Sequence, residues 1–486
     1  MEQRMFGSTE KKKGERWRRF LKEENGQVTV FLTLLLCVIV PVILITLEII
    51  RYEQAKGRVH HMAVGAVEQI MADYEVEMAD WYHIYTLDEN YLGRGKEVAS
   101  NRAWDYLEEN LISVDWLGRT EGFYNFIVKD AQIVPTQYLY EEECQSLKKQ
   151  IHKWTLYTMI PTNKRKKRED IQKQDTEQGE KAPIYDQTTS DQDDREEIDP
   201  RGIIEAIKRI GILTVASNPN LPLSKAIIDQ KDLPSKQLSW AKKEGTEGEG
   251  SILLEKLELE TYIFQHFQSA LSVVRENETA YSNEMEYLIA GKQSDYDCLE
   301  KVARQMVGLR LPLNLYAIHR DGAKKGEAKV AATIIAVLAA QPEAIEGITE
   351  GILGAWAYGE SIADVKCLLQ GEKVPLKKNK SNWKLSFSQL FHMETMVPKQ
   401  SKDGIGYEDY LKLLLGKVPE KTIYFRMLDL MQLNIQMKYP EFKIQDCVTK
   451  YELTTTIQLD TRFFALPVKK GAQYEFIVSH AGGYDG

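Results

Sequence analysis

The sequence predicts a mainly α-helical α+β protein that is attached to a membrane by its N-terminal segment. The prediction rests on an uncharged apolar run, a three-four spacing of apolar residues beyond it, and an alternating pattern near the C-terminus. The chain has 486 residues, 43% of them hydrophobic, so it is long enough for two or three packed domains. We expect an N-terminal transmembrane helix that continues into a stalk helix, an α-rich extracytoplasmic domain and a small C-terminal antiparallel β element.

The apolar run from Val28 to Leu47 has the length of a membrane-spanning helix, because about twenty helical residues cover about 30 Å of hydrocarbon. A secretory signal peptide would have a shorter apolar region of about 7 to 15 residues, followed by a small-residue cleavage site. No such site follows this longer run, so we do not expect cleavage at its far end. Basic residues are concentrated before the run, which predicts a cytoplasmic N-terminus and an extracytoplasmic remainder. They are Arg4, Lys11, Lys12, Lys13, Arg16, Arg18, Arg19 and Lys22.

The end of the run carries Glu48 and, three residues later, Arg51. Glu48 lies about 30 Å along the helix from Gln27, so we expect it at the outer membrane interface, paired with Arg51. Pro41 inside the span is tolerated with a kink. An apolar stripe then continues the helical spacing, and either later helices of the same chain or a second chain must cover it; we favour the former, because no strict heptad is visible. Its members are Tyr52, Ala55, Val59, Met62, Ala66, Ile70, Tyr74, Met78, Trp81 and Tyr85.

Composition and periodicity divide the chain into six segments. The predicted segments are a cytoplasmic basic segment (1–26), a transmembrane helix (27–50), a stalk helix with a first extracytoplasmic subdomain (51–161), a disordered charged linker (162–200), an α-rich extracytoplasmic domain (201–440) and a C-terminal β element (441–486). The linker is dense in both charges and almost without aliphatic residues, so it cannot form a packed core.

Helical patterns dominate the segments after residue 97, with a short strand-like stretch at 123–134. We expect helices at 97–111, 148–159, 203–224, 253–288, 298–319, 327–340 and 342–369. Near the C-terminus the spacing changes to two, with Tyr451, Leu453, Thr455, Ile457 and Leu459 on one side of a strand. A second short strand after it predicts a closing hairpin.

The sequence lacks the common enzyme motifs, and its net charge of -9 argues against a general nucleic-acid binder. The most suggestive polar pair is Glu360 and Asp364, one helical turn apart and close to Trp356, Tyr358 and Lys366. Two such carboxylates can bind a metal or act as an acid and base. A helix with one apolar and one polar side gives the same pattern, and we prefer this structural interpretation. We therefore predict no catalytic residue, metal site or cofactor.

The histidines and cysteines also give no clear site. His60 and His61 are adjacent, so they point to different faces of the stalk and do not form a chelating pair. Cys37 lies within the apolar run. Cys144, Cys298, Cys367 and Cys447 have no regular spacing, and whether they form disulfides on the oxidising side of the membrane is left open.

Several motifs are similar to those of a known family. They are "GQVTVFLTLLL", "LEIIRYEQAK", "YHIYTLDENYLG", "AWAYGESIADVKCLLQGEKVPLKK", "IGYEDYLKLLL" and "RMLDLMQLNIQ". With these motifs the chain resembles an uncharacterised membrane-protein family of clostridial-type bacteria, number 5702 in the domain-of-unknown-function series. The resemblance implies an association with Tad pilus or type II secretion-like machinery, whose TadE and TadG proteins also have a basic N-terminus and a single N-terminal transmembrane helix.

The chain departs from true pilins at one position. A prepilin peptidase site would place Gly26 before the cut and a glutamate as the fifth residue after it, but Phe31 stands there. An uncleaved anchor is therefore expected, although processing after Gly26 is left open.

Three functional hypotheses follow. The leading one is a non-enzymatic, single-pass membrane protein that acts as a pseudopilin-like or accessory component of a Tad-type pilus or type II secretion-like assembly. Its expected partners are the lipid bilayer and proteins of that assembly, not nucleic acid. The second hypothesis is a membrane-tethered binding or adhesion module for the cell wall or a host surface. The third is an enzyme that depends on Glu360 and Asp364.

Overall fold

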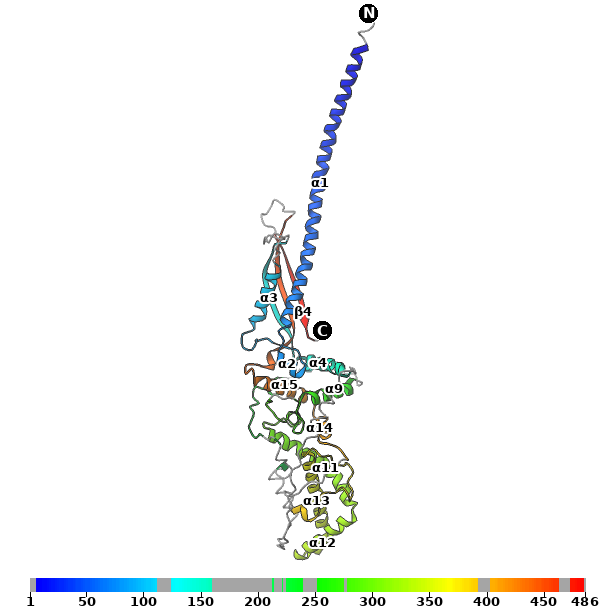
Figure 1. The fold of residues 1–486 in the computed structure, drawn as a ribbon, viewed down its shortest axis with the longest axis vertical. Helices are drawn as coiled ribbons and strands as arrows, with labels where there is room; N and C mark the ends of the chain where they lie inside the picture. The colour runs from blue at the N-terminus through cyan, green and yellow to red at the C-terminus, as the bar shows by residue number, and fades with distance from the viewer. Residues whose placement is uncertain are drawn as a thin grey trace, which may run out of the picture.

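The protein is an elongated molecule from which one long helix projects (Figure 1). The computed structural model describes residues 6–111, 124–159, 212–213, 221, 224–238, 251–274, 278–391, 403–462 and 473–484. The predicted linker (162–200) and most of the predicted helix at 203–224 lie outside these residues. The mainly α fold class with a small antiparallel sheet is confirmed.

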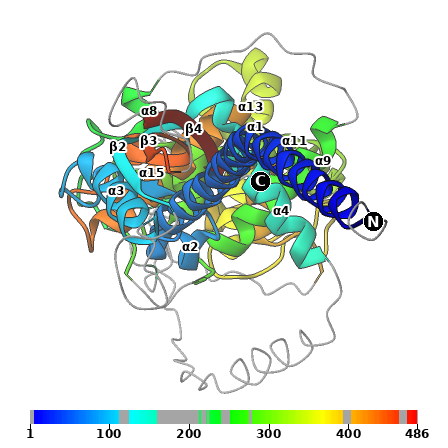
Figure 2. The same cartoon turned by 90° about the horizontal axis from the view of Figure 1, so that it is seen from above.

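The projecting helix, α1 (Phe6–Met71), joins two stretches with opposite surroundings. From Val28 to Ile50 most of its apolar side chains are exposed, and Phe31 is 66% exposed. This part of α1 is long and apolar enough to cross a membrane. From Ala55 to Ile70 the same helix presents a fully buried face to the body of the protein (Figures 1 and 2).

The buried face of α1 packs on an antiparallel sheet and on helix α3 (Glu97–Leu111). The sheet combines β1 (Leu87–Asp88) and β2 (Phe126–Tyr138) with β3 (Cys447–Asp460) and β4 (Gln473–Gly483) from the C-terminal region. β3 is central, since it pairs with all three other strands. The predicted alternation along β3 is confirmed, because Tyr451, Leu453, Thr455, Ile457 and Leu459 are all buried.

The sheet explains how the stalk stripe is covered. Ala55, Val59, Ala66 and Ile70 share a core with inward-facing residues of β3 and β4, so the chain covers its own stripe with a sheet as well as with a helix. Small residues on both sides allow a close approach. A Cβ atom at Gly482 of β4 would lie only 2.6 Å from Cγ1 of Val67.

The helical pattern of the stalk ends earlier than the stripe suggested. α1 ends at Met71, and the short helix α2 (Val76–Tyr82) follows. Between them the chain turns, because the Glu75 amide donates to the Thr86 carbonyl instead of continuing the helix. The predicted continuous stalk through Tyr85 is therefore wrong.

The remaining helices form a second, larger core at the end of the molecule opposite to the N-terminus (Figure 1). They are α4 (Glu141–Met159), α8 (Pro234–Gln237), α9 (Ser251–His266), α10 (Glu284–Ala290), α11 (Asp295–His319), α12 (Gly322–Leu338), α13 (Ile345–Leu368), α14 (Tyr407–Leu415) and α15 (Glu420–Gln436), with short 3₁₀ turns at Pro342–Ala344, Ser388–Phe391 and Ile444–Asp446. α11, α12 and α13 lie side by side and form the far tip.

One predicted helix of this body, at 253–288, is two helices. α9 ends at His266, and α10 begins at Glu284. In a continuous helix the backbone amides of Gln268 and Ala270 would donate to carbonyls one turn earlier. Here the Gln268 amide donates to the Glu284 carboxylate, and the Ala270 amide donates to the Glu286 carboxylate. These contacts join residues 16 positions apart, so the helical spacing of apolar residues does not predict them.

The charged pair at the end of the apolar segment joins α1 to the sheet. Arg51 donates to the Glu48 carboxylate at 2.9 Å and to the Asp460 carbonyl at the end of β3 at 2.8 Å. The Glu48 and Arg51 side chains are only 4% and 2% exposed. The predicted ion pair is confirmed, and its hydrogen bond to Asp460 joins this end of the apolar segment to the sheet.

All five cysteines lie within the described residues, and none of them forms a disulfide. Cys144, Cys298, Cys367 and Cys447 are all free and buried, and Cys37 is free and exposed on the apolar part of α1. The question that the sequence left open is thus answered in favour of free thiols.

Candidate functional site

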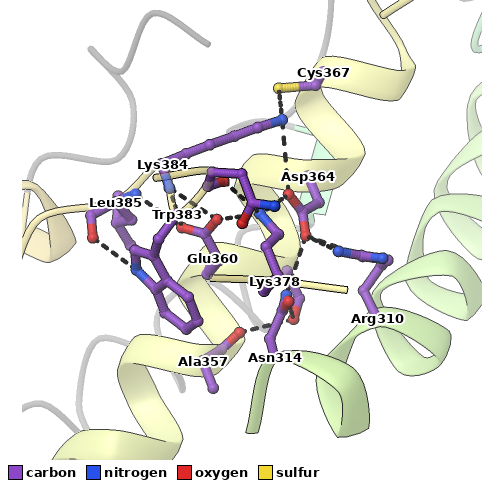
Figure 3. Close-up of polar contacts among 12 residues, drawn as sticks. Arg310, Asn314, Ala357, Glu360, Asp364, Cys367, Lys378, Trp383, Lys384 and Leu385 are labelled. Atoms are coloured by element: carbon purple, nitrogen blue, oxygen red, sulfur yellow. Dashed lines mark hydrogen bonds and ion pairs between the residues drawn. The ribbon is translucent and has the colours of Figure 1, made fainter. Parts of the chain in front are cut away.

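Glu360 and Asp364 lie on α13 at the centre of a buried charge cluster (Figure 3). Both residues are 0% exposed. The polar side of this helix does not face solvent at these two residues. Packing against α11 and the segment after α13 covers it, and cations from those two elements neutralise the carboxylates. We call Arg310, Asn314, Glu360, Asp364, Lys378 and Lys384 the buried charge cluster.

Asp364 is held by α11 from one side and by Lys378 from the other. Oδ2 accepts from Nε and Nη2 of Arg310 at 3.0 and 2.8 Å and from the amide of Asn314 at 3.1 Å. Oδ1 accepts from the Lys378 ammonium at 2.7 Å. Arg310 also donates to the hydroxyl of Tyr410 on α14 at 3.2 Å, so the cluster ties three helices together.

Glu360 binds the segment that follows α13. It pairs with the Lys378 ammonium, and it accepts from the backbone amides of Lys384 and Leu385 at 2.8 to 3.1 Å. The Leu385 carbonyl in turn accepts from the indole N–H groups of Trp356 and Trp383, both at 2.9 Å. A segment without regular secondary structure is thereby fixed to α13.

The electrostatics of the cluster follow from its burial. Burial raises the pKa of Glu360; Lys378 opposes this change, and Asp364 adds to it. Burial alone would lower the pKa of Arg310, but Asp364 and Tyr410 raise it. Burial likewise raises the pKa of the Cys367 thiol, which lies 2.6 Å from the Lys384 ammonium. The Lys384 ammonium opposes this rise in the pKa of Cys367 without reversing it.

The hydrogen bonds of the cluster hold α11, α13, α14 and the segment after α13 together. All four carboxylate oxygens of Glu360 and Asp364 accept hydrogen bonds from protein donors. A general acid or base must be within hydrogen-bond reach of its substrate, and these side chains are enclosed. Among the described residues, no group of three or more histidine, cysteine, aspartate or glutamate side chains is placed to hold a metal ion.

A surface cleft of about 590 Å³ adjoins the cluster. One wall is the last turns of α11, and the other is the segment after α13. The lining residues are Leu313, Tyr316, Ala317, Arg320, Asp321, Leu376, Lys377, Lys378, Asn379, Lys380 and Trp383. Lys378 belongs to both features, so the buried charge cluster contributes to the lining of the cleft.

Sequence reasoning singled out Glu360, Asp364 and Trp356 but missed Arg310, Asn314 and Lys378. A signal for the first two exists, because Arg310 and Asn314 interrupt the apolar run "MVGLRLPLNLYAI" at a spacing of four. Both are 0% exposed, which is rare for arginine unless it is paired. No local pattern distinguishes Lys378 from the neighbouring lysines in "PLKKNK".

Comparison with known protein families decides the membership of the chain. A family of unknown function (DUF5702) matches residues 190–459, more than half of the chain. The chain belongs to this family. The DUF5702 region contains the whole buried charge cluster and the cleft, and it extends into β3, whereas α1 precedes it. Searches among curated proteins and solved structures found no match.

Proposed function

We propose that the protein is a non-enzymatic, single-pass membrane protein with a cytoplasmic N-terminus and an extracytoplasmic body. The exposed apolar part of α1 supports the lipid bilayer as its surroundings, since side chains such as Phe31 would otherwise face water. The basic residues before it support the orientation. The net charge of -9 makes nucleic acid an unsuitable partner.

We further propose that the body serves a Tad-type pilus or type II secretion-like assembly as a pseudopilin-like or accessory component. The observation that carries this proposal is the continuity of α1. The helix passes without interruption from its apolar part into the core of the body, and Arg51 fixes it to β3 at the transition. An anchor built in this way connects the membrane segment to the body without a flexible joint in α1. Phe31 favours an uncleaved anchor.

Co-purification from native membranes tests this role. We expect a tagged full-length protein, solubilised in mild detergent, to bring down pilins or platform proteins of the assembly, and we expect its deletion to reduce piliation or secretion. Complexes that never contain such proteins, together with unchanged piliation and secretion in the deletion strain, would rule the role out. The mass of the mature N-terminus shows in the same preparation whether Gly26 is a cleavage site.

A second candidate function is a membrane-tethered binding module. The cleft beside the buried charge cluster favours it, because about 590 Å³ is within the range of ligand-binding sites, about 300 to 1,000 Å³. We assign no catalytic role to Glu360 or Asp364. An activity or metal-binding screen that distinguished the wild type from a Glu360→Ala/Asp364→Ala variant with an intact fold would contradict this assignment.

A further inference from the structure

The cleft has an excess of positive charge at its rim. Four lining residues are basic, and one, Asp321, is acidic. Lys378 is neutralised from inside by Glu360 and Asp364. Asp321 caps α12 by accepting from the Ala323 amide, and it lies 3.7 Å from the Lys380 ammonium.

Two of the cations remain uncompensated. No carboxylate in the described part of the chain forms an ion pair with Arg320 or Lys377. Arg320 donates to the hydroxyl of Tyr316 at 2.6 Å, which orients its guanidinium without cancelling its charge. A ligand with carboxylates or other anionic groups would be attracted to this rim.

Three of the other lining residues have large, mostly apolar side chains. Leu313, Tyr316 and Leu376 are 39%, 63% and 52% exposed, which is high for large side chains grouped in a concave site. Removal of such side chains from water by a bound ligand makes the free energy of binding more favourable. The ligand should therefore present aliphatic groups between its charges. The membrane that holds α1 is an unsuitable source, because the cleft belongs to the tip formed by α11, α12 and α13, at the opposite end of the molecule (Figure 1).

A sugar polymer matches this lining less well than a peptide. A neutral glycan would leave the charges of Arg320 and Lys377 uncompensated, and Asn379 is the one amide among the lining residues. Its side-chain oxygen already accepts from the amides of Ser381 and Asn382 at 3.0 and 3.1 Å. Leucine side chains flanked by cations are instead complementary to the aliphatic and carboxylate side chains of a peptide.

The wall that carries these groups is fixed before any ligand arrives. Glu360 accepts from the backbone amides of Lys384 and Leu385, and the side-chain amide of Asn382 donates to the Lys377 carbonyl at 3.0 Å. A wall that is already ordered does not have to lose conformational entropy on binding. The buried charge cluster therefore orders one wall of the surface cleft.

We propose that the cleft between the end of α11 and residues 376–383 binds an acidic peptide segment with aliphatic side chains, contributed by a partner protein. The proposal goes beyond the role in a pilus or secretion assembly and does not depend on it. Failure of the protein to bind peptide would not change the co-purification result. Unchanged piliation and secretion in the deletion strain would not change the peptide-binding result.

Fluorescence anisotropy with full-length protein in nanodiscs tests the proposal. The probe is a labelled heptapeptide of alternating Glu and Leu, compared with versions in which Gln replaces Glu or Ala replaces Leu. We expect the Glu/Leu peptide to bind at least tenfold more tightly than either version. We expect the variant Arg320→Gln/Lys377→Gln to lose at least tenfold in affinity, and Leu376→Asn to lose several-fold.

The matched control is Lys329→Gln/Lys417→Gln, which removes two exposed lysines that do not line the cleft and should change the affinity less than twofold. Equal effects of the two double variants would overturn the proposal, as would equal binding of the Glu/Leu and Gln/Leu peptides. Tight binding of polyglycerol phosphate without binding of the Glu/Leu peptide would assign the cleft to an anionic polymer and would also overturn it.

Discussion

Lys378 is the cation on which the buried charge cluster depends, because it pairs with both Glu360 and Asp364. Removal of one partner from a buried ion pair leaves an uncompensated charge, which typically costs about 3–5 kcal/mol. We predict a loss of this size in the free energy of unfolding for Lys378→Met, measured by urea titration.

The neighbouring Lys377 provides a control for this prediction, since it is exposed. Lys377→Met should change the free energy of unfolding by less than about 0.5 kcal/mol. Similar unfolding curves for the two variants would show that the cluster does not stabilise the fold as we describe.

His83 links α2 to α9 through a histidine pair. Its Nδ1 lies 3.1 Å from Nε2 of His266, and burial lowers the pKa of His83, although Asp80 opposes this change. The folded protein therefore resists protonation of His83, whereas the unfolded chain takes up the proton near the usual pKa of about 6.5. The unfolded state binds more protons as the pH falls through this value, so acid should destabilise the fold.

We predict that the melting temperature falls between pH 7.5 and pH 5.5 and that His83→Asn reduces this fall. Asparagine suits the position, because His83 has a left-handed backbone (φ 55°) at the end of α2. His61→Gln, at an exposed position of α1, should leave the pH dependence unchanged. If His83→Asn has the same pH dependence as the wild type, the pair does not sense pH.

At the scale of elements, the packing of α1 on the sheet depends on small side chains. Ala63 is 0% exposed and lies in the core shared with β3 and β4. Ala63→Leu should cost about 1–3 kcal/mol in the free energy of unfolding, because the added atoms force the helix away from the sheet. Lys56→Leu, on the exposed side of the same helix, is the control and should have little effect.

Elements whose pattern is local could be predicted from the sequence, and elements that depend on distant partners could not. α3, α11 and α13 follow the helical spacing of their own residues. β2 extends four residues beyond its expected end at Val134, to Tyr138, because β3, more than 300 residues away, pairs with it. In the candidate site, Glu360 and Asp364 are one turn apart on a single helix, whereas Arg310 and Lys378 approach them only after folding.

At the scale of the whole molecule, the central claim is that α1 crosses the membrane once and places the body outside. The four body cysteines are buried and Cys37 lies in the apolar segment, so the folded protein should give little background with maleimide reagents. Single new cysteines can therefore report the topology. Ser8→Cys marks the N-terminal segment, and Ser479→Cys marks an exposed position on β4.

Labelling of intact cells with a membrane-impermeant maleimide tests this claim most directly. We predict that Ser479→Cys is labelled in intact cells and that Ser8→Cys is labelled only after the membrane is permeabilised. Labelling of Ser8→Cys in intact cells, or protection of Ser479→Cys until lysis, would contradict the proposed topology and with it the extracytoplasmic function.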